Sequence, residues 1–194
     1  MDSFSLAYTS TTGACVDTFA VTVGSSRDYP NLCGTLTGDH MYLETGRATT
    51  AQTLAFTIAA TTGSATYKIK VSQIECYNTN RAPDDCFQYF TGRSGRVKSL
   101  NRSNSRMLQN MRYTACIRRE SGTCGIHWAP TTTTEYSPSD SYDIGNSASA
   151  VVGSSAAALT AVIIIPGTLG TTYSGQTFAD TAAVTSDSST TGNS

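Results

Sequence analysis

The sequence predicts an all-β protein whose strands pack as an antiparallel sandwich. Three observations point to this class. Short stretches alternate apolar and polar residues, which is the spacing of half-buried strands. Gly, Ser, Thr and Asn separate these stretches at short intervals, as turns between neighbouring strands do. Helical periodicity is missing, and only residues 105–111 could form a single helical turn.

The strands expected in the first half of the chain are short, and turn residues separate them. They cover residues 3–8, 19–23, 41–43, 54–58 and 67–74. The last of these alternates most cleanly. Its apolar spacing of two residues becomes three between Val71 and Ile74, which predicts a β-bulge near Ser72 and Gln73.

The second half begins with two strands that belong to a cysteine-rich stretch, at residues 116–118 and 125–128. From Thr131 the composition shifts to small residues, and we expect weak strands near residues 142–144 and 150–152. Residues 161–165 predict a buried strand that a Pro-Gly turn ends. The last residues, 181–194, are rich in Ser and Thr and predict a mobile tail.

The six cysteines favour a disulfide framework over a zinc site. An even number of cysteines is typical of proteins from an oxidising compartment. The sequence has no CxxC pair, and His40 and His127 lack the spacing of zinc ligands. The residues alone leave open the roughly 15 pairings that six cysteines allow.

Charge is distributed unevenly along a chain whose net charge is −1. Residues 81–129 carry nine basic and three acidic side chains, whereas residues 130–194 carry five acidic and no basic ones. The basic block is either a solvated β-surface or an anion-binding face. If it binds anions, the candidate residues are Arg93, Arg96, Lys98, Arg102 and Arg106.

The basic block does not indicate nucleic-acid binding, because it lacks zinc-finger and RNA-binding signatures. A sulfated glycan or an acidic protein fits the basic block better. The segment of residues 130–194, which carries five acidic and no basic side chains, is itself a candidate partner. Asn101, Arg102 and Ser103 form an N-glycosylation sequon in a predicted loop, which makes Asn101 a candidate glycan site.

Catalysis and membrane insertion are not expected. The GxSxG pattern of a serine hydrolase does not occur, both histidines lie in strand-like settings, and the adjacent Asp84 and Asp85 read as a turn. The longest strongly apolar run, residues 162–165, is far shorter than the roughly 18 residues of a membrane span. No leader pattern follows Met1, so we expect a removed leader or a fragment.

Several stretches of sequence match a known pattern when they are taken together. They are residues 15–19, 33–34, 38–43, 68–76, 82–92, 95–101, 113–118, 124–128 and 164–167. In combination they resemble the CUB domain family, and especially the tandem-CUB extracellular proteins of arthropods. The resemblance implies a jelly-roll type β-sandwich of two modules, both incomplete. These are residues 1–75 and residues 76–180, followed by a tail of residues 181–194.

The resemblance also implies specific cysteine pairs and bears on metal binding. The implied disulfides are Cys15–Cys33, Cys86–Cys116 and Cys76–Cys124. Many CUB domains hold calcium with one Glu and two Asp, but only Asp17 matches that set here, and Ala161 stands where another Asp is expected. We therefore expect no metal and no cofactor, and interpret Asp17 as a turn or surface residue.

The sequence thus predicts a non-catalytic, secreted extracellular protein that binds through the loops and sheet edges of CUB-like sandwiches. Its expected partner is an extracellular protein or glycan, not nucleic acid and not a membrane. The alternative is a structural subunit that self-associates into an extracellular filament or matrix by edge-strand pairing. Incomplete sandwiches leave unpaired sheet edges, and such edges can accept another strand.

Overall fold

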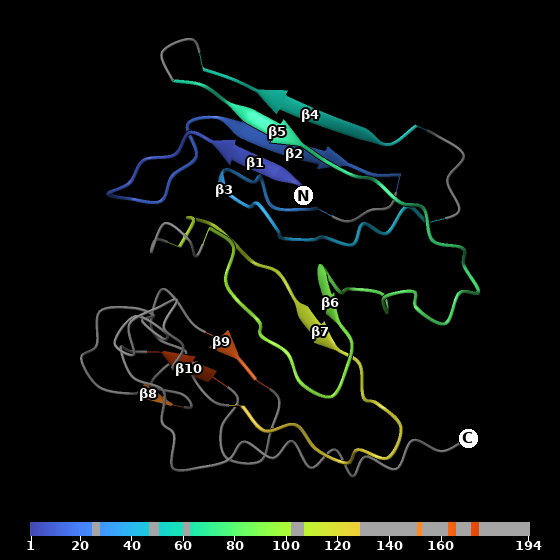
Figure 1. The fold of residues 1–194 in the computed structure, drawn as a ribbon. Coiled ribbons are helices and arrows are strands. Elements are labelled where there is room, and N and C mark those ends of the chain that lie inside the picture. The colour runs from blue at the N-terminus through green and yellow to red at the C-terminus, as the bar shows by residue number, and fades with distance from the viewer. Residues whose placement is uncertain are drawn as a thin grey trace. The chain divides into compact units, whose positions relative to one another are not determined.

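The computed structural model (Figure 1) divides the chain into two compact units, Met1–Arg118 and Arg119–Ser194, called here the N-terminal and C-terminal units. Each is described by itself. The structure describes residues 1–24, 28–46, 51–59, 63–101, 107–128, 151–152, 163–165 and 172–174. These residues form β-strands and contain no helix, so the predicted all-β class is confirmed for the described part of the chain.

Two antiparallel sheets form the sandwich of the N-terminal unit. The first has the order β3-β1-β5 and consists of β1 (Ser3–Leu6), β3 (Gly34–Thr35) and β5 (Thr66–Lys68). The second pairs β2 (Thr18–Thr22) with β4 (Thr53–Thr57) over their full length. All pairs in these two sheets are antiparallel, as the alternating pattern predicts.

Aromatic residues from both sheets fill the space between them. Phe4 of β1 and Phe19 of β2 are fully buried, and their ring centroids are 5.6 Å apart with an edge-on geometry. Phe19 also contacts Phe56 of β4, with 4.7 Å between ring centroids. Each large buried ring contributes on the order of 2 kcal/mol through removal of its apolar surface from water. The two sheets therefore pack face to face through this aromatic row.

The same core continues into residues well beyond the sandwich strands. Phe87, Leu100 and Leu108 are buried in one cluster with Phe4 and Phe19. The core thus draws on residues from both sides of position 75, where the sequence analysis places a module boundary. The division into modules 1–75 and 76–180 and a tail stays a prediction.

One strand pair departs from the predicted antiparallel arrangement. β6 (Gln88–Phe90) and β7 (Ala115–Ile117) run parallel, with Tyr89 opposite Cys116. A parallel pair requires a long crossover connection, which residues 91–114 supply. The local residue pattern carries no signal for this, because strand direction depends on the path of that connection.

The C-terminal unit contains a small antiparallel sheet with the order β8-β10-β9. Its strands are β8 (Val151–Val152), β9 (Ile163–Ile164) and β10 (Thr172–Ser174). The prediction of a buried strand at residues 161–165 is wrong in one respect, because Ile163 and Ile164 are exposed and only Ile165 is buried. Within the described part of this unit β9 pairs with β10 alone, so its apolar residues are not covered as those of a central strand would be.

Several other strand predictions end early or fail. The strand predicted at residues 67–74 stops at Lys68, because β1 begins at Ser3, the residue opposite Lys68. The β-bulge predicted near Ser72 is therefore absent, since Ser72 does not lie in a strand. Residues 41–43 and 125–128 are irregular, and residues 107–111 form no helical turn. The strand expected at residues 142–144 and the tail at 181–194 lie outside the described residues.

Candidate functional site

An exposed loop between β5 and β6, residues 71–85, carries the two most exposed large apolar side chains among the described residues. It is called the Tyr77 loop here. Tyr77 is 99% exposed and Val71 is 70% exposed. Large side chains that are this exposed to solvent offer apolar surface for contact with a partner. The sequence analysis did not single out Tyr77, although its position in a polar, Asn-rich turn was a usable signal.

Turns hold the Tyr77 loop in a defined shape. The Asn78 amide donates to the carbonyl of Glu75 (3.1 Å), and the Arg81 amide donates to the carbonyl of Asn78 (3.0 Å). The Asn78 side chain accepts from the Asn80 amide at 2.8 Å, which is a local turn that Asn favours. Arg118 Nη1 donates to Asn80 Oδ1 (3.1 Å) and so links the loop to the residue after β7.

A shallow, open depression of about 360 Å³ lies along this loop, with Cys76, Tyr77 and Pro83 among its lining residues. At its rim Arg81 Nη2 and Asp84 Oδ1 form an ion pair of 2.6 Å. Both side chains are about half exposed or more, so solvent screening leaves this pair little effect on stability. The depression therefore presents an aromatic ring beside a charged rim.

The residues predicted to bind anions are only partly described, and they do not form one cluster. Lys98 Nζ lies 3.0 Å from Asp39 Oδ1, and Asp39 is buried, so this lysine compensates an internal carboxylate. Arg93 and Arg96 are exposed on the segment after β6 and have interactions of their own. Arg102 and Arg106 lie outside the described residues.

Asp39 lies near a partly buried tyrosine, Tyr113. The backbone amide of Leu100 donates to the Tyr113 hydroxyl at 3.2 Å. Burial raises the pKa of Tyr113 above 10.0, the Leu100 hydrogen bond lowers it, and the Asp39 carboxylate raises it further. Tyr113 is therefore held in its neutral form by the interior of the protein.

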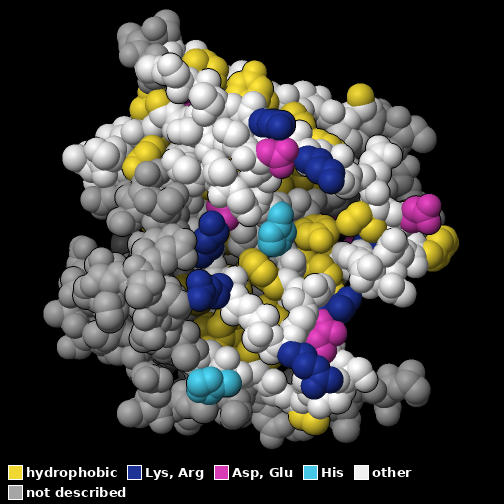
Figure 2. Space-filling view, viewed as in Figure 1, with side chains coloured by type: hydrophobic (Ala, Val, Ile, Leu, Met, Phe, Trp, Pro, Cys, Tyr) yellow, Lys and Arg dark blue, Asp and Glu magenta, His cyan; other side chains and the backbone are white. Residues whose placement is uncertain are grey.

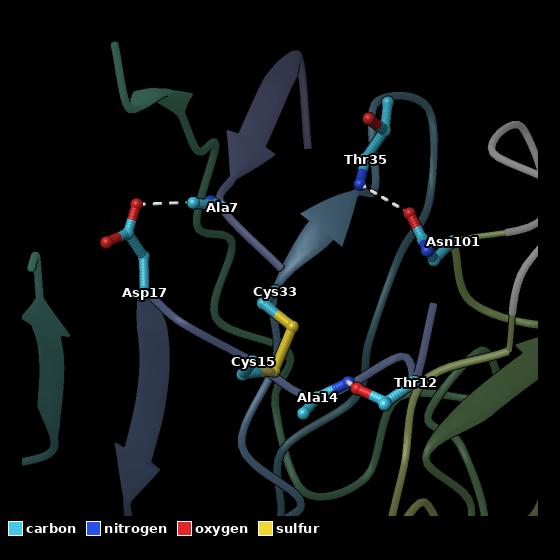
Figure 3. The surroundings of a disulfide bond; sticks show 8 residues. All are labelled: Ala7, Thr12, Ala14, Cys15, Asp17, Cys33, Thr35 and Asn101. Carbon is cyan, nitrogen blue, oxygen red and sulfur yellow. Dashed lines mark hydrogen bonds between the residues drawn. A yellow bond between two sulfur atoms is a disulfide. The ribbon is translucent and has the colours of Figure 1, made fainter. Parts of the chain in front are cut away.

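Asn101, the candidate glycan site, is fully buried rather than in an exposed loop. Its Oδ1 accepts a hydrogen bond from the Thr35 amide at 2.8 Å (Figure 3). The Asn101 side chain also packs against Gly34. Gly34 has a φ of +72°, and a Cβ at that position would collide with the Asn101 side chain. A glycan on Asn101 is incompatible with this packing, which corrects the interpretation of the sequon.

Asp17 is also internal, not the turn or surface residue that the sequence suggested. It is 0% exposed, and its two carboxylate oxygens accept hydrogen bonds from the backbone amides of Ala7 (3.1 Å) and Ala59 (2.9 Å). Figure 3 shows the first of these bonds beside the Cys15–Cys33 disulfide. Asp17 thus links the segments that follow β1 and β4, so its role is to stabilise the fold.

His40 ties the irregular segment before Tyr42 to β6. Its Nε2 lies 3.1 Å from the carbonyl oxygen of Tyr89 and 3.3 Å from the Tyr89 amide, so either tautomer finds a backbone partner. The imidazole contacts the rings of Tyr42 and Phe90 edge-on. His127, the other histidine, is exposed in the C-terminal unit.

Four cysteines form disulfides in the structure, and two do not. Cys15–Cys33 and Cys86–Cys116 are bonded, and these are two of the three pairs that the family resemblance implied. Cys76 and Cys124 are exposed free cysteines, so the structure lacks the third implied pair. Cys76 lies in the N-terminal unit and Cys124 in the C-terminal unit, and the third implied pair stays a prediction.

Comparison with known proteins identifies the family. A family model described as the animal CUB domain matches residues 83–194. No curated protein and no solved structure matches the chain. Among the described residues, no helix is long and apolar enough to cross a membrane. The all-β, mainly antiparallel architecture agrees with a CUB β-sandwich. Since the match covers 112 of the 194 residues, the protein belongs to the animal CUB domain family.

Proposed function

We propose that this protein is a non-catalytic, secreted protein that binds an extracellular protein or glycan through exposed loops of its CUB-like sandwich. Animal CUB domains are typically extracellular, and they suggest a binding role in general. The observation that carries the proposal is Tyr77, which is 99% exposed on a loop whose turns fix its shape. A rigid, exposed tyrosine gives contact area at a low entropic cost, and tyrosines are enriched among the residues that dominate binding energy.

Two features of the described residues support a non-catalytic role. The Nε2 atom of His40 is engaged by the backbone of Tyr89, and the two oxygens of Asp17 are engaged by backbone amides. Groups held in this way serve the fold. We also propose, from the sequence resemblance, that the chain is related to the tandem-CUB proteins of arthropods and contains two modules, residues 1–75 and 76–180.

The binding proposal can be tested with a defined panel of probes. We would screen the full chain against an array of sulfated and neutral glycans and against purified extracellular matrix proteins. For any probe that binds, Tyr77→Ala should weaken binding by about tenfold or more, because it removes the exposed ring. Val97→Ala is the matched control, since Val97 is an exposed apolar residue outside the Tyr77 loop. Equal affinities for both variants would contradict the role of the loop.

A second candidate function is self-association through sheet edges, which would make the chain a structural subunit of a filament or matrix. The feature that favours it is β4, which pairs with β2 on one side and with no other strand among the described residues. Light scattering of the full chain over a wide concentration range tests this candidate. Mass that stays at that of one chain, 20.4 kDa, at every concentration would exclude it.

A further inference from the structure

The outward edge of β4 carries backbone groups that lack a partner among the described residues. Phe19 of β2 exchanges two backbone hydrogen bonds with Leu32, at 2.8 and 2.9 Å, so its amide and carbonyl face away from β4. The opposed residues Phe19 and Phe56 are therefore a non-hydrogen-bonded pair. Pair types alternate along an antiparallel ladder. It follows that the backbone groups of Leu54 and Phe56 face the open edge.

This edge has none of the features that usually prevent strands from pairing. Natural edge strands are protected by charged side chains, prolines or bulges. Residues 48–67 contain no charged residue and no proline, and β4 lies within them. Leu54 and Ile58 are 39% and 45% exposed. β4 is the uppermost strand in Figure 1, and Figure 2 shows hydrophobic surface in the same region.

The facing sheet is open on the same side. β5 is the edge strand of the sheet β3-β1-β5, and Tyr67 of β5 stacks on Phe56 of β4 with 3.9 Å between ring centroids. Tyr67 remains 53% exposed. An uncharged strand with small and apolar side chains fits against this edge without charge repulsion. The β4 strand of another copy has that composition.

We propose that β4 pairs antiparallel with β4 of a second copy across a two-fold axis at Ala55, which joins the two β2-β4 sheets into one four-stranded sheet. In this register Leu54 of each copy exchanges two backbone hydrogen bonds with Phe56 of the other. Ala55 faces its own counterpart at the non-hydrogen-bonded position, where Cα atoms approach to about 4.5 Å. Alanine is small enough for that close approach, and its position in β4 is exposed.

Two-fold pairing closes on itself, because each copy uses the same edge. The expected product is a dimer and not a growing filament. This inference rests on the second proposed function, self-association, and is independent of the ligand that the Tyr77 loop binds. Tyr77→Ala should leave the dimer unchanged, so failure of one proposal is distinguishable from failure of the other.

Charge variants at the axis test the pairing. The full chain should show a reversible monomer–dimer equilibrium in sedimentation velocity with its thiols alkylated. Ala55→Lys places two like charges opposite each other and should raise the dimer Kd by at least about tenfold. Ala55→Glu should do the same, and an equimolar mixture of the two variants should dimerise again. Ser64→Lys, an exposed position outside the strand with the same change of charge, should dimerise normally.

A cysteine variant tests the register. In a background with Cys76→Ser and Cys124→Ser, Ala55→Cys should form an interchain disulfide on mild oxidation, because the two Cα atoms would lie within disulfide range. Thr57→Cys should not, since that residue would lie opposite Thr53 of the other copy. Purely monomeric protein at all concentrations would overturn the proposal. So would assemblies that Ala55→Lys leaves unchanged, or efficient crosslinking at position 57 and not at 55.

Discussion

The carboxylate of Asp17 joins three segments of the N-terminal unit. It lies just before β2 and accepts hydrogen bonds from the amides of Ala7 and Ala59, which follow β1 and β4. Asp17→Asn would leave one oxygen to serve two amides and would add a buried donor. We expect this change to lower the free energy of unfolding by about 1–3 kcal/mol, measured by urea denaturation. Asp84→Asn, at an exposed ion pair, should change it by less than about 1 kcal/mol.

Gly34 and Gly38 allow the cost of a side-chain collision to be separated from backbone strain. Both have positive φ, +72° and +84°, but a Cβ at Gly34 meets Asn101 whereas a Cβ at Gly38 meets open space. Gly38→Ala should cost about 1 kcal/mol through its left-handed backbone alone. Gly34→Ala should cost at least about 2 kcal/mol, because the displaced Asn101 also loses its bond to Thr35. Equal losses in urea denaturation would contradict the packing described for Asn101.

Tyr113 should make the stability depend on pH at the alkaline end. Its pKa is raised in the folded protein, chiefly by burial, so folding favours the neutral hydroxyl. That contribution is complete below pH 10 and is lost as the pH rises through the folded-state pKa. Tyr113→Phe should therefore flatten the fall in unfolding free energy above pH 10, at a cost of about 1 kcal/mol near pH 7 from the lost hydrogen bond.

The control for this effect is Tyr77→Phe, because that hydroxyl is in water in both the folded and the unfolded state. The alkaline slope should be the same in Tyr77→Phe as in the parent protein. A slope that Tyr113→Phe leaves untouched would mean that other groups cause the alkaline loss of stability.

At the scale of elements, the two disulfides and two free thiols give a defined labelling pattern. Iodoacetamide added to the folded, unreduced protein should modify two cysteines, Cys76 and Cys124, because both are exposed and free. Reduction and unfolding should raise the count to six. Intact mass and peptide mapping measure both numbers. Absence of label on the folded protein would instead support the Cys76–Cys124 bridge that the family resemblance implied.

The sequence predicts well those strands that show an alternating apolar pattern within their own residues. The sequence predicts β2 and β4 within about a residue, because Phe19, which is buried, and Phe56, which is partly buried, belong to alternating stretches. The parallel pairing of β6 with β7 was not predicted, since direction depends on a connection with no pattern of its own. The loss of the predicted strand beyond Lys68 depends on where β1 begins.

The same distinction applies to the candidate site. The sequence predicts an exposed sequon at Asn101, because the residue that holds its side chain, Thr35, is 66 residues away in the chain. The basic residues near it are close together in sequence. Lys98, however, forms an ion pair with Asp39, and no local sequence pattern links these two residues. By contrast, the pairs Cys15–Cys33 and Cys86–Cys116 followed from resemblance to a family, which already contains long-range information.

At the scale of the whole molecule, the continuity of the core predicts how the chain can be divided. Both buried clusters, including Phe87, Leu100 and Leu108, lie within Met1–Arg118. A fragment of residues 1–118 should unfold cooperatively with both disulfides intact, as followed by circular dichroism in urea. A fragment of residues 1–75 should be less stable, because it lacks those three core residues. Equal stability of the two fragments would favour the boundary at residue 75.

The two disulfides also determine how the chain would respond to a pulling force on its ends. Tension passes through a covalent bridge, so the segment inside each bridge is shielded from load. The bridges span 18 and 30 residues. At roughly 3.5 Å per extended residue, the Cys86–Cys116 bridge alone keeps about 100 Å of contour length from extending. A chain built in this way stretches in two stages, and the length inside the bridges is released only where the surroundings become reducing.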